Sequence, residues 1–288
     1  MKPAAFTYHR ARDVDGAVDL LTELGDDTKI IAGGQSLVPM MNFRLARPAH
    51  LVDVTALPGL STISTDEEGL HIGPLTTHRA VETAPDSLIG HDHAVLREAM
   101  AWVGHLPIRT LGTVGGSLAH GDATAEWCLL AVLLDARVVV RGPGGAQRTI
   151  EAADLFLGFY MTTLAPDEII VDVVFPKPAP HSALTEFAER AGDFAAVAAA
   201  VDLDLAVDGT VRGGRVALGG VAPVPVRVPE AEAVLQDGGT VGPELFAACA
   251  EAAEAAIDPP SDADGSSDYR RVLARTLIVR ACEEAVAR

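Results

Sequence analysis

Two glycine pairs carry the residue types best suited to binding an anion. Gly33 and Gly34 follow the largely apolar run 29–32, and Gly115 and Gly116 follow a second apolar stretch. Consecutive glycines adopt positive φ without steric cost, so successive N–H groups of such a turn can point at one phosphate group. A single pair is typical of an ordinary tight turn. Two pairs, each followed by Ser and Leu, predict two phosphate-binding turns.

Two anion-binding turns suit the pyrophosphate of a dinucleotide, because both of its charges need N–H donors. Neither turn has the GxGxxG pattern of a Rossmann domain. No GK[ST] follows either turn, which excludes a P-loop. The sequence therefore predicts a dinucleotide-binding domain of another class.

The net charge of the chain limits how such an anion can be held. The 288 residues carry a formal charge of −18, with 22 Lys and Arg against 40 Asp and Glu. This balance disfavours a nucleic acid or an anionic membrane surface as a partner. Backbone amides bind an anion without basic side chains, and each charge-assisted hydrogen bond contributes about 1.5–3 kcal/mol.

The residue types that usually carry catalysis or bind metals form no recognisable pattern. Cys128, Cys249 and Cys282 are far apart in apolar surroundings, so we expect small buried side chains rather than metal ligands. The nine His form no metal-binding pair, and there is no GxSxG motif, poised Cys–His pair or close carboxylate pair. We expect no metal site and no catalytic side chain. Any chemistry would come from a cofactor.

No targeting or membrane-spanning segment is recognisable. The N-terminal residues lack a hydrophobic secretory core, and no apolar run approaches the ~20 residues that cross a bilayer. A cytoplasmic protein is expected.

Hydrophobic periodicity and turn residues predict a mixed α+β chain. The predicted helices cover 14–24, 95–106, 123–133, 244–257 and 269–286. The predicted strands cover 29–32, 51–54, 70–73, 136–141, 147–150, 168–175, 184–190, 197–207 and 211–218. Asp154 is predicted to cap a segment over 155–160, Asp208-Gly209 to form a hairpin turn, and His78 to lie at the surface or cap a helix.

A proline-rich stretch predicts the domain boundary. Three prolines in residues 176–180 can continue neither a helix nor a strand. We therefore expect one domain over 1–177, with subdomains of about 1–57 and 58–177, and a smaller one over 181–288 that holds an antiparallel sheet and helices.

The two glycine segments and their surroundings resemble a known family. The first runs from Ala32 to Pro39 and continues into 44–53, and the second runs from Thr113 to His120. Together with Gly192-Asp193-Phe194, they are similar to the FAD-binding medium subunit of molybdenum hydroxylases, the carbon monoxide dehydrogenase and xanthine dehydrogenase type of enzyme. The likeness runs nearly end to end.

The resemblance implies a vanillyl-alcohol-oxidase (PCMH)-type FAD-binding domain in two subdomains, followed by a carbon monoxide dehydrogenase flavoprotein C-terminal domain. The glycine segments would wrap the FAD pyrophosphate, the acidic residues would bind cofactor hydroxyls, and apolar residues would pack near the isoalloxazine. The implied cofactor-binding residues are Lys29, Ile31, Ala32, Gly33, Gly34, Gln35, Ser36, Leu37, Thr113, Gly115, Gly116, Ser117, Ala119, His120, Asp122, Glu126, Ile169, Ile170 and Phe194.

The same resemblance implies the role of the chain. It would be an oxidoreductase subunit in a heterotrimer with a small [2Fe–2S] subunit and a large molybdopterin subunit, with dimerisation of that assembly left open. It would accept electrons from the iron–sulfur clusters and pass them through FAD to an external acceptor. The alternatives are a free-standing FAD-dependent oxidoreductase that acts directly on a small molecule, and a flavin-free scaffold. The sequence identifies neither substrate nor acceptor.

Four positions depart from the family pattern. Phe194 stands where relatives have Tyr, Gly121 where they have Ala, and Glu126 where they often have Asp. A Lys that is frequent in relatives near Ala188 and Glu189 is missing. These differences bear on redox tuning and on the electron acceptor more than on FAD binding.

Overall fold

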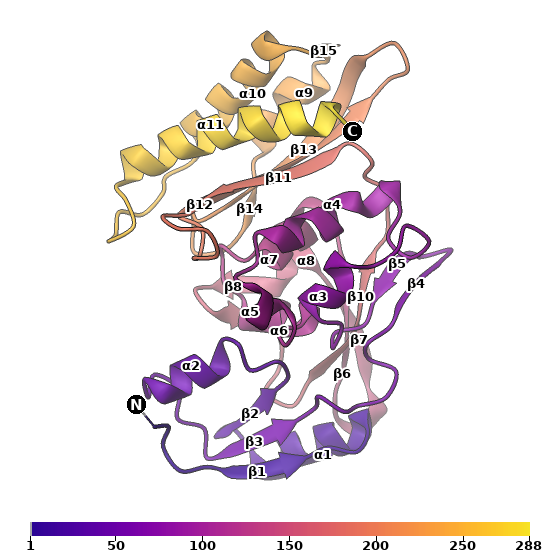
Figure 1. The fold of residues 1–288 in the computed structure, drawn as a ribbon, viewed down its shortest axis with the longest axis vertical. Helices are drawn as coiled ribbons and strands as arrows, with labels where there is room; N and C mark the ends of the chain where they lie inside the picture. Colours follow the sequence, from indigo (N-terminus) through magenta and orange to yellow (C-terminus); the bar gives the residue numbers. More distant parts are fainter. Residues whose placement is uncertain (1) are drawn as a thin grey trace.

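A computed structural model describes residues 2–288, whose three larger sheets are arranged along the long axis of the molecule (Figure 1). A small parallel sheet with the N-terminal helix lies at one end. A five-stranded antiparallel sheet with short helices lies in the middle, and an antiparallel sheet covered by long helices lies at the other end.

The N-terminal unit is a three-stranded parallel sheet in the order β1-β3-β2, made of β1 (Thr7–Arg10), β2 (Thr28–Ile31) and β3 (His50–Asp53). Helix α1 (Val14–Leu24) packs on it, and Val18 and Leu21 share a core with Val52. Asp13 caps this helix, since its carboxylate accepts a hydrogen bond from the N–H of Gly16. A short helix, α2 (Leu37–Asn42), follows β2 directly.

The central sheet has the order β4-β5-β10-β6-β7. Its strands are β4 (Ile63–Asp66), β5 (Gly69–Ile72), β6 (Arg137–Arg141), β7 (Gln147–Glu151) and β10 (Ile169–Phe175). The helices beside it are α3 (His78–Glu82), α4 (Ala94–Glu98), α5 (Leu106–Arg109), α6 (Val114–His120), α7 (Glu126–Leu133) and α8 (Ala152–Leu155). A small hairpin joins β8 (Phe156–Gly158) to β9 (Met161–Thr162). Helix α7 is buried on all sides, as its uniformly apolar sequence requires.

The C-terminal unit pairs β11 (Ser182–Phe187), β12 (Val197–Leu205), β13 (Thr210–Gly219) and β14 (Val226–Arg227), with β15 (Gly239–Thr240) beside β13. Helices α9 (Pro229–Gln236), α10 (Pro243–Ala256) and α11 (Ser267–Val286) cover one face of this sheet (Figure 1). The other face meets the central unit: Leu184, Ala198 and Ala217 belong to its core. The predicted hairpin between β12 and β13 is confirmed, with Gly209 at φ 80°.

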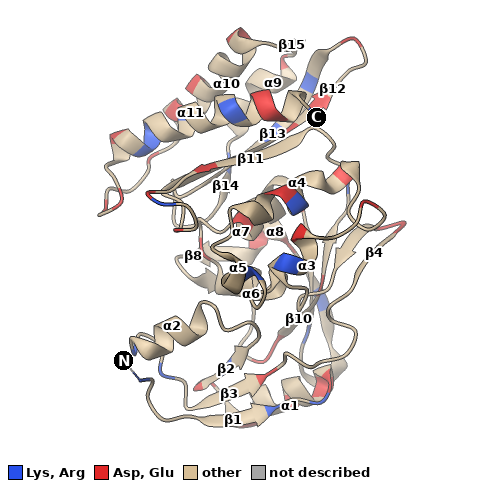
Figure 2. Cartoon of the chain, in the orientation of Figure 1, with Lys and Arg blue, Asp and Glu red and all other residues tan. Residues whose placement is uncertain are grey.

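An ion-pair network joins the central and C-terminal units on one side. Asp135, after α7, accepts hydrogen bonds from Arg215 at 2.9 Å and Arg227 at 3.0 Å, while Arg215 also donates to Asp202 and Arg227 to Glu232. Figure 2 shows that acidic residues outnumber basic ones over much of the chain. Several arginines are therefore occupied as counter-ions within the fold.

Three local predictions are wrong. The predicted helix over 95–106 ends after the 3₁₀ turn Ala99–Ala101, because Gly104 at φ 44° reverses the chain. Asp154 lies inside α8 rather than capping 155–160, where the chain turns into β8. His78 is buried, and its Nδ1 accepts a hydrogen bond from Trp127 Nε1 at 3.0 Å. Burial, reinforced by the charge of Arg109, lowers the pKa of His78 to about 4.

Candidate FAD-binding site

The first glycine segment has the geometry of an anion cradle. Gly34 has φ 70°, and the side-chain amide of Gln35 closes the turn by donating to the carbonyl of Gly33 at 2.8 Å. Within residues 2–288, no protein acceptor meets the backbone N–H groups of residues 33–37, which are half-exposed. Five consecutive N–H groups without a protein partner are unusual unless water or a ligand accepts from them.

Gly33 brings the two predicted segments together. A Cβ atom on Gly33 would lie 2.0 Å from the carbonyl oxygen of Leu111 and 2.8 Å from Cα of Gly112. Only glycine allows this close approach of two backbones. The cradle therefore lies directly against the chain that enters α6, in agreement with the prediction that both segments serve one ligand.

The second glycine pair does not form the predicted turn. Gly115 and Gly116 lie inside α6 with negative φ, because Thr113 caps this helix by accepting the N–H of Gly116 at 3.1 Å. The N–H of Gly115 donates to Pro74 O at 2.9 Å, and that of Ser117 donates to Thr113 O. These amides are already satisfied, so the hydroxyl groups of Thr113 and Ser117, rather than a second set of free amides, are the donors available to a ligand.

The segment after α6 gathers several predicted residues. Gly121, at φ 66°, ends the helix. Oδ1 of Asp122 accepts hydrogen bonds from the N–H and hydroxyl of Thr124, both at 2.9 Å. The ring of His120 lies 4.9 Å from that of Tyr160 on the β8–β9 hairpin. Burial lowers the pKa of His120 in spite of the charge of Asp122, so this imidazole is neutral at pH 7.

The other predicted residues are more dispersed. Lys29 is exposed on β2, whereas Ile31 lies beneath the cradle, 3.5 Å from where a Cβ of Gly34 would be. Ile169 and Ile170 are both 5% exposed at the start of β10, in the cores of the N-terminal and central units. Phe194 is 74% exposed, on a loop between β11 and β12.

Two residues near this site escaped the sequence analysis. Tyr160 stacks beside His120, and the charge of Asp122 with burial raises the pKa of its phenol. Glu186 on β11 is 9% exposed and lies close enough to Glu126 to influence its ionisation. Tyr160 has a positive φ of 55°, and no sequence pattern flags that conformation for a Tyr.

The three cysteines are buried and free, as predicted. Burial, together with the charges of Asp122 and Glu126, raises the pKa of Cys128 well above its usual value, which makes its thiol unreactive. In the described chain, no cluster of three or more His, Cys, Asp or Glu side chains could hold a metal ion. Residues 2–288 also contain no helix of sufficient length and apolarity to cross a membrane.

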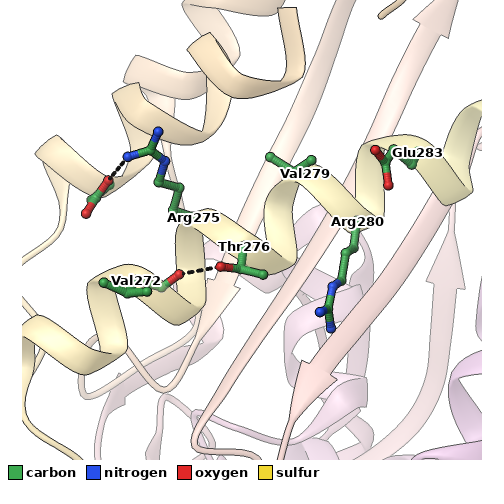
Figure 3. A pocket seen from close by; sticks show the side chains of 7 residues that line it. Val272, Arg275, Thr276, Val279, Arg280 and Glu283 are labelled. Carbon is green, nitrogen blue, oxygen red and sulfur yellow. Dashed lines mark hydrogen bonds and ion pairs between the residues drawn. The ribbon is translucent and has the colours of Figure 1, made fainter. Parts of the chain in front are cut away.

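A separate hollow of about 570 Å³ lies on α11, far along the chain from the glycine segments (Figure 3). Its walls include Val272 and Arg275, and Arg275 pairs with Glu254 on α10 at 3.4 Å (Figure 3). None of the predicted cofactor residues lines this hollow. It therefore has no part in the site described above.

The residues of the cradle fit the pyrophosphate of FAD. Five N–H groups without partners offer donors to two phosphate groups, and α2 after them carries no charged side chain that would repel an anion (Figure 2). Gly34 adopts the left-handed conformation of this turn, which glycine allows without steric cost. The fit depends on main-chain donors, as the acidic composition predicted.

Comparisons with known proteins agree with this geometry. The family described as "FAD binding domain in molybdopterin dehydrogenase" matches residues 4–178, and "CO dehydrogenase flavoprotein C-terminal domain" matches residues 182–285. The nicotine 6-hydroxylase medium subunit of Paenarthrobacter nicotinovorans is 41% identical over 288 residues, 100% of both chains. The carbon monoxide dehydrogenase medium chain of Hydrogenophaga pseudoflava is 34% identical, covering 100% of this chain and 99% of that one. A solved structure of carbon monoxide dehydrogenase from Hydrogenophaga pseudoflava aligns with a TM-score of 0.93 at 36% identity, covering 100% of this chain and 99% of that chain.

Fold and site together define an FAD-binding subunit of an oxidoreductase. The chain belongs to the family of FAD-binding medium subunits of molybdenum hydroxylases, which includes the carbon monoxide dehydrogenase medium chains. The predicted family, the two-part FAD-binding fold with its C-terminal domain, the oxidoreductase class and FAD as cofactor are therefore confirmed.

Proposed function

We propose that this chain is the electron-transfer subunit of its complex, accepting electrons from the [2Fe–2S] clusters of a partner and passing them through FAD to an external acceptor. The observation that carries the proposal is the run of five unpartnered N–H groups at residues 33–37, pressed against the entry to α6. Bound FAD would supply the redox chemistry, since residues 4–178 match a family of FAD-binding domains.

We propose the following roles in FAD binding for the predicted residues. The segment from Ala32 to Ser36 wraps the pyrophosphate and donates the unpartnered N–H groups that begin at Gly33, with Thr113 and Ser117 adding hydroxyl donors. Asp122 and Glu126 bind cofactor hydroxyls. The remaining assigned residues shape the walls of the site: Lys29, Ile31, Leu37, Gly115, Gly116, Ala119, His120, Ile169, Ile170 and Phe194.

The proposed partners are a small [2Fe–2S] subunit and a large molybdopterin subunit in a heterotrimer. Large apolar side chains are exposed at the end of α2 and on the β8–β9 hairpin, and exposed apolar clusters of this kind often mark protein contacts. They are Phe43, Leu45, Leu157, Phe159 and Met161. We propose that the complex resides in the cytoplasm and that the substrate is selected by another subunit.

We also propose the division of the chain at 177–181, with subdomains of about 1–57 and 58–177 and a C-terminal domain over 181–288. The proline-rich residues 176–180 support this division, because β10 ends just before them and β11 begins just after them.

Purification of the chain from its native host tests this function. We expect stoichiometric FAD by visible absorbance, and co-elution with iron, acid-labile sulfide and molybdenum. Reduction of the flavin by an organic substrate in the isolated chain, without iron or molybdenum, would instead support a free-standing oxidoreductase. A colourless protein that takes up no added FAD would contradict both.

A further inference from the structure

Two carboxyl side chains lie near the contact between the central and C-terminal units, and neither has a basic partner. Glu126 begins α7, and Glu186 lies on β11. Glu186 is 9% exposed, and its Oε2 atom is buried with no hydrogen-bond partner. No lysine, arginine or histidine of residues 2–288 forms an ion pair with either carboxyl.

The alternation along β11 shows which way Glu186 points. Thr185 donates its hydroxyl to Leu277 O on α11 at 2.9 Å, and Ala183 belongs to the C-terminal core. Leu184 belongs to the core of the central unit. Successive side chains of a strand point to opposite faces, so Glu186 faces the central unit with Leu184.

The electrostatics agree with this placement. Burial raises the pKa of Glu126 to about 8, and the negative charges of Glu186 and Asp122 add to the effect. Burial raises the pKa of Glu186 to about 7. Two carboxyl groups so placed are costly to ionise together, so near neutral pH the pair retains a proton.

The charged groups of the packed elements do not neutralise this pair. On α4, Arg97 pairs with Asp86 and Glu98 pairs with Arg288. His120 on α6 is neutral at pH 7. At the far end of the shared sheet face, Arg215 and Arg227 pair with the acidic residues Asp135, Asp202 and Glu232, and Asp204 pairs with Arg212.

The position of the pair connects it to the cofactor site. Glu126 is four residues beyond Asp122, in the segment assigned to cofactor hydroxyls. A buried polar atom without a protein partner is rare in native proteins, and a ligand or an ordered water commonly satisfies it.

We propose that Glu186 is a cofactor-contacting residue supplied by the C-terminal unit, and that its carboxyl group donates a hydrogen bond to a polar atom of bound FAD. The inference rests on the proposed assignment of residues 113–126 to the FAD site. It makes FAD binding depend on both units of the chain and on the retained proton.

The test compares FAD binding by the apo-chain and its Glu186→Gln and Glu186→Leu variants, followed by quenching of flavin fluorescence between pH 6 and pH 9. Above about pH 8, Glu126 and Glu186 lose their remaining proton in the FAD-free chain. Because FAD binding must then restore this proton, the wild-type Kd should rise by up to about tenfold per pH unit. Glu186→Gln keeps a neutral donor and should flatten this rise. Glu186→Leu should raise the Kd at pH 7 by about 10-fold.

Glu189→Gln is the matched control, because Glu189 is exposed just beyond the same strand, and its Kd should equal that of the wild type at every pH. If wild type binds FAD and Glu186→Leu binds it equally well across the pH range, the inference is wrong while the FAD-site assignment stands. If the wild type binds no FAD, the site assignment fails as well. Circular dichroism verifies that each variant is folded. If Glu186→Leu does not fold, the pH profile of the near-isosteric Glu186→Gln decides the test.

Discussion

Gly34→Val should abolish FAD binding while leaving most of the fold intact. Gly34 has φ 70°, and its ideal Cβ position lies 3.1 Å from Cγ2 of Val38 and 3.5 Å from Cδ1 of Ile31. A β-branched residue adopts this conformation only with strain of about 1–2 kcal/mol, and its methyl groups would occupy the space in which the N–H groups converge. Loss of two charge-assisted hydrogen bonds to the pyrophosphate should weaken binding by at least about 100-fold.

The measurement is the flavin content of the purified variant, followed by titration of the apo-chain with FAD. Gly59→Val is the matched control, since Gly59 has a similar φ of 79° and no atom lies within 4 Å of its ideal Cβ position. It should lose comparable stability but retain stoichiometric FAD. Equal flavin retention by both variants would show that residues 33–37 are not the pyrophosphate site.

The first cradle could be predicted because its determinants are local. An apolar strand, two glycines and a small polar residue specify a left-handed turn before a helix, and Gly34 takes that conformation. The contact of Gly33 with Leu111 was not specified locally, because it joins segments nearly 80 residues apart. The two glycine pairs suggested a single dinucleotide ligand for both segments, but no local pattern predicts the direct contact of their backbones.

The second glycine pair shows that two consecutive glycines can also lie inside a helix. Thr113 is a good N-cap, and its hydroxyl accepts the N–H of Gly116, so the chain winds into α6 instead of turning. The sequence contained this helix-start signal, because Thr113 precedes a short run that contains glycine but no proline. Glycine in this helix is explained by packing, because Gly115 lies against Pro74.

Other features lay beyond sequence reasoning for physical reasons. Strand β1 is short and polar, and it exists because β3, some 40 residues later, pairs with it. Glu186 is one of six residues in a largely buried strand, and only the packing of both sheet faces reveals that its carboxyl is buried without a partner. Long-range pairing and burial of this kind leave no local pattern.

Arg270→Leu should destabilise the C-terminal unit by about 3–5 kcal/mol, the cost expected for breaking a buried charge network and leaving its acceptors unpaired. Arg270 is 4% exposed. Its Nη1 donates to the carbonyls of Ala196 and Gly220, and its Nη2 donates to Asp262 at 2.6 Å. One side chain thereby ties α11 to the start of β12 and to the end of β13.

Urea denaturation of the full chain, followed by circular dichroism, measures this loss. Arg271→Leu is the neighbouring control, because Arg271 pairs with Asp258, whose side chain is 94% exposed, and such surface pairs contribute about 0–1 kcal/mol. The loop that carries Phe194 leads directly into the residues held by Arg270, so Arg270→Leu should also weaken FAD binding. Equal denaturation midpoints for the two variants would mean that other donors satisfy the carbonyls of Ala196 and Gly220, and that α11 is held by its apolar face alone.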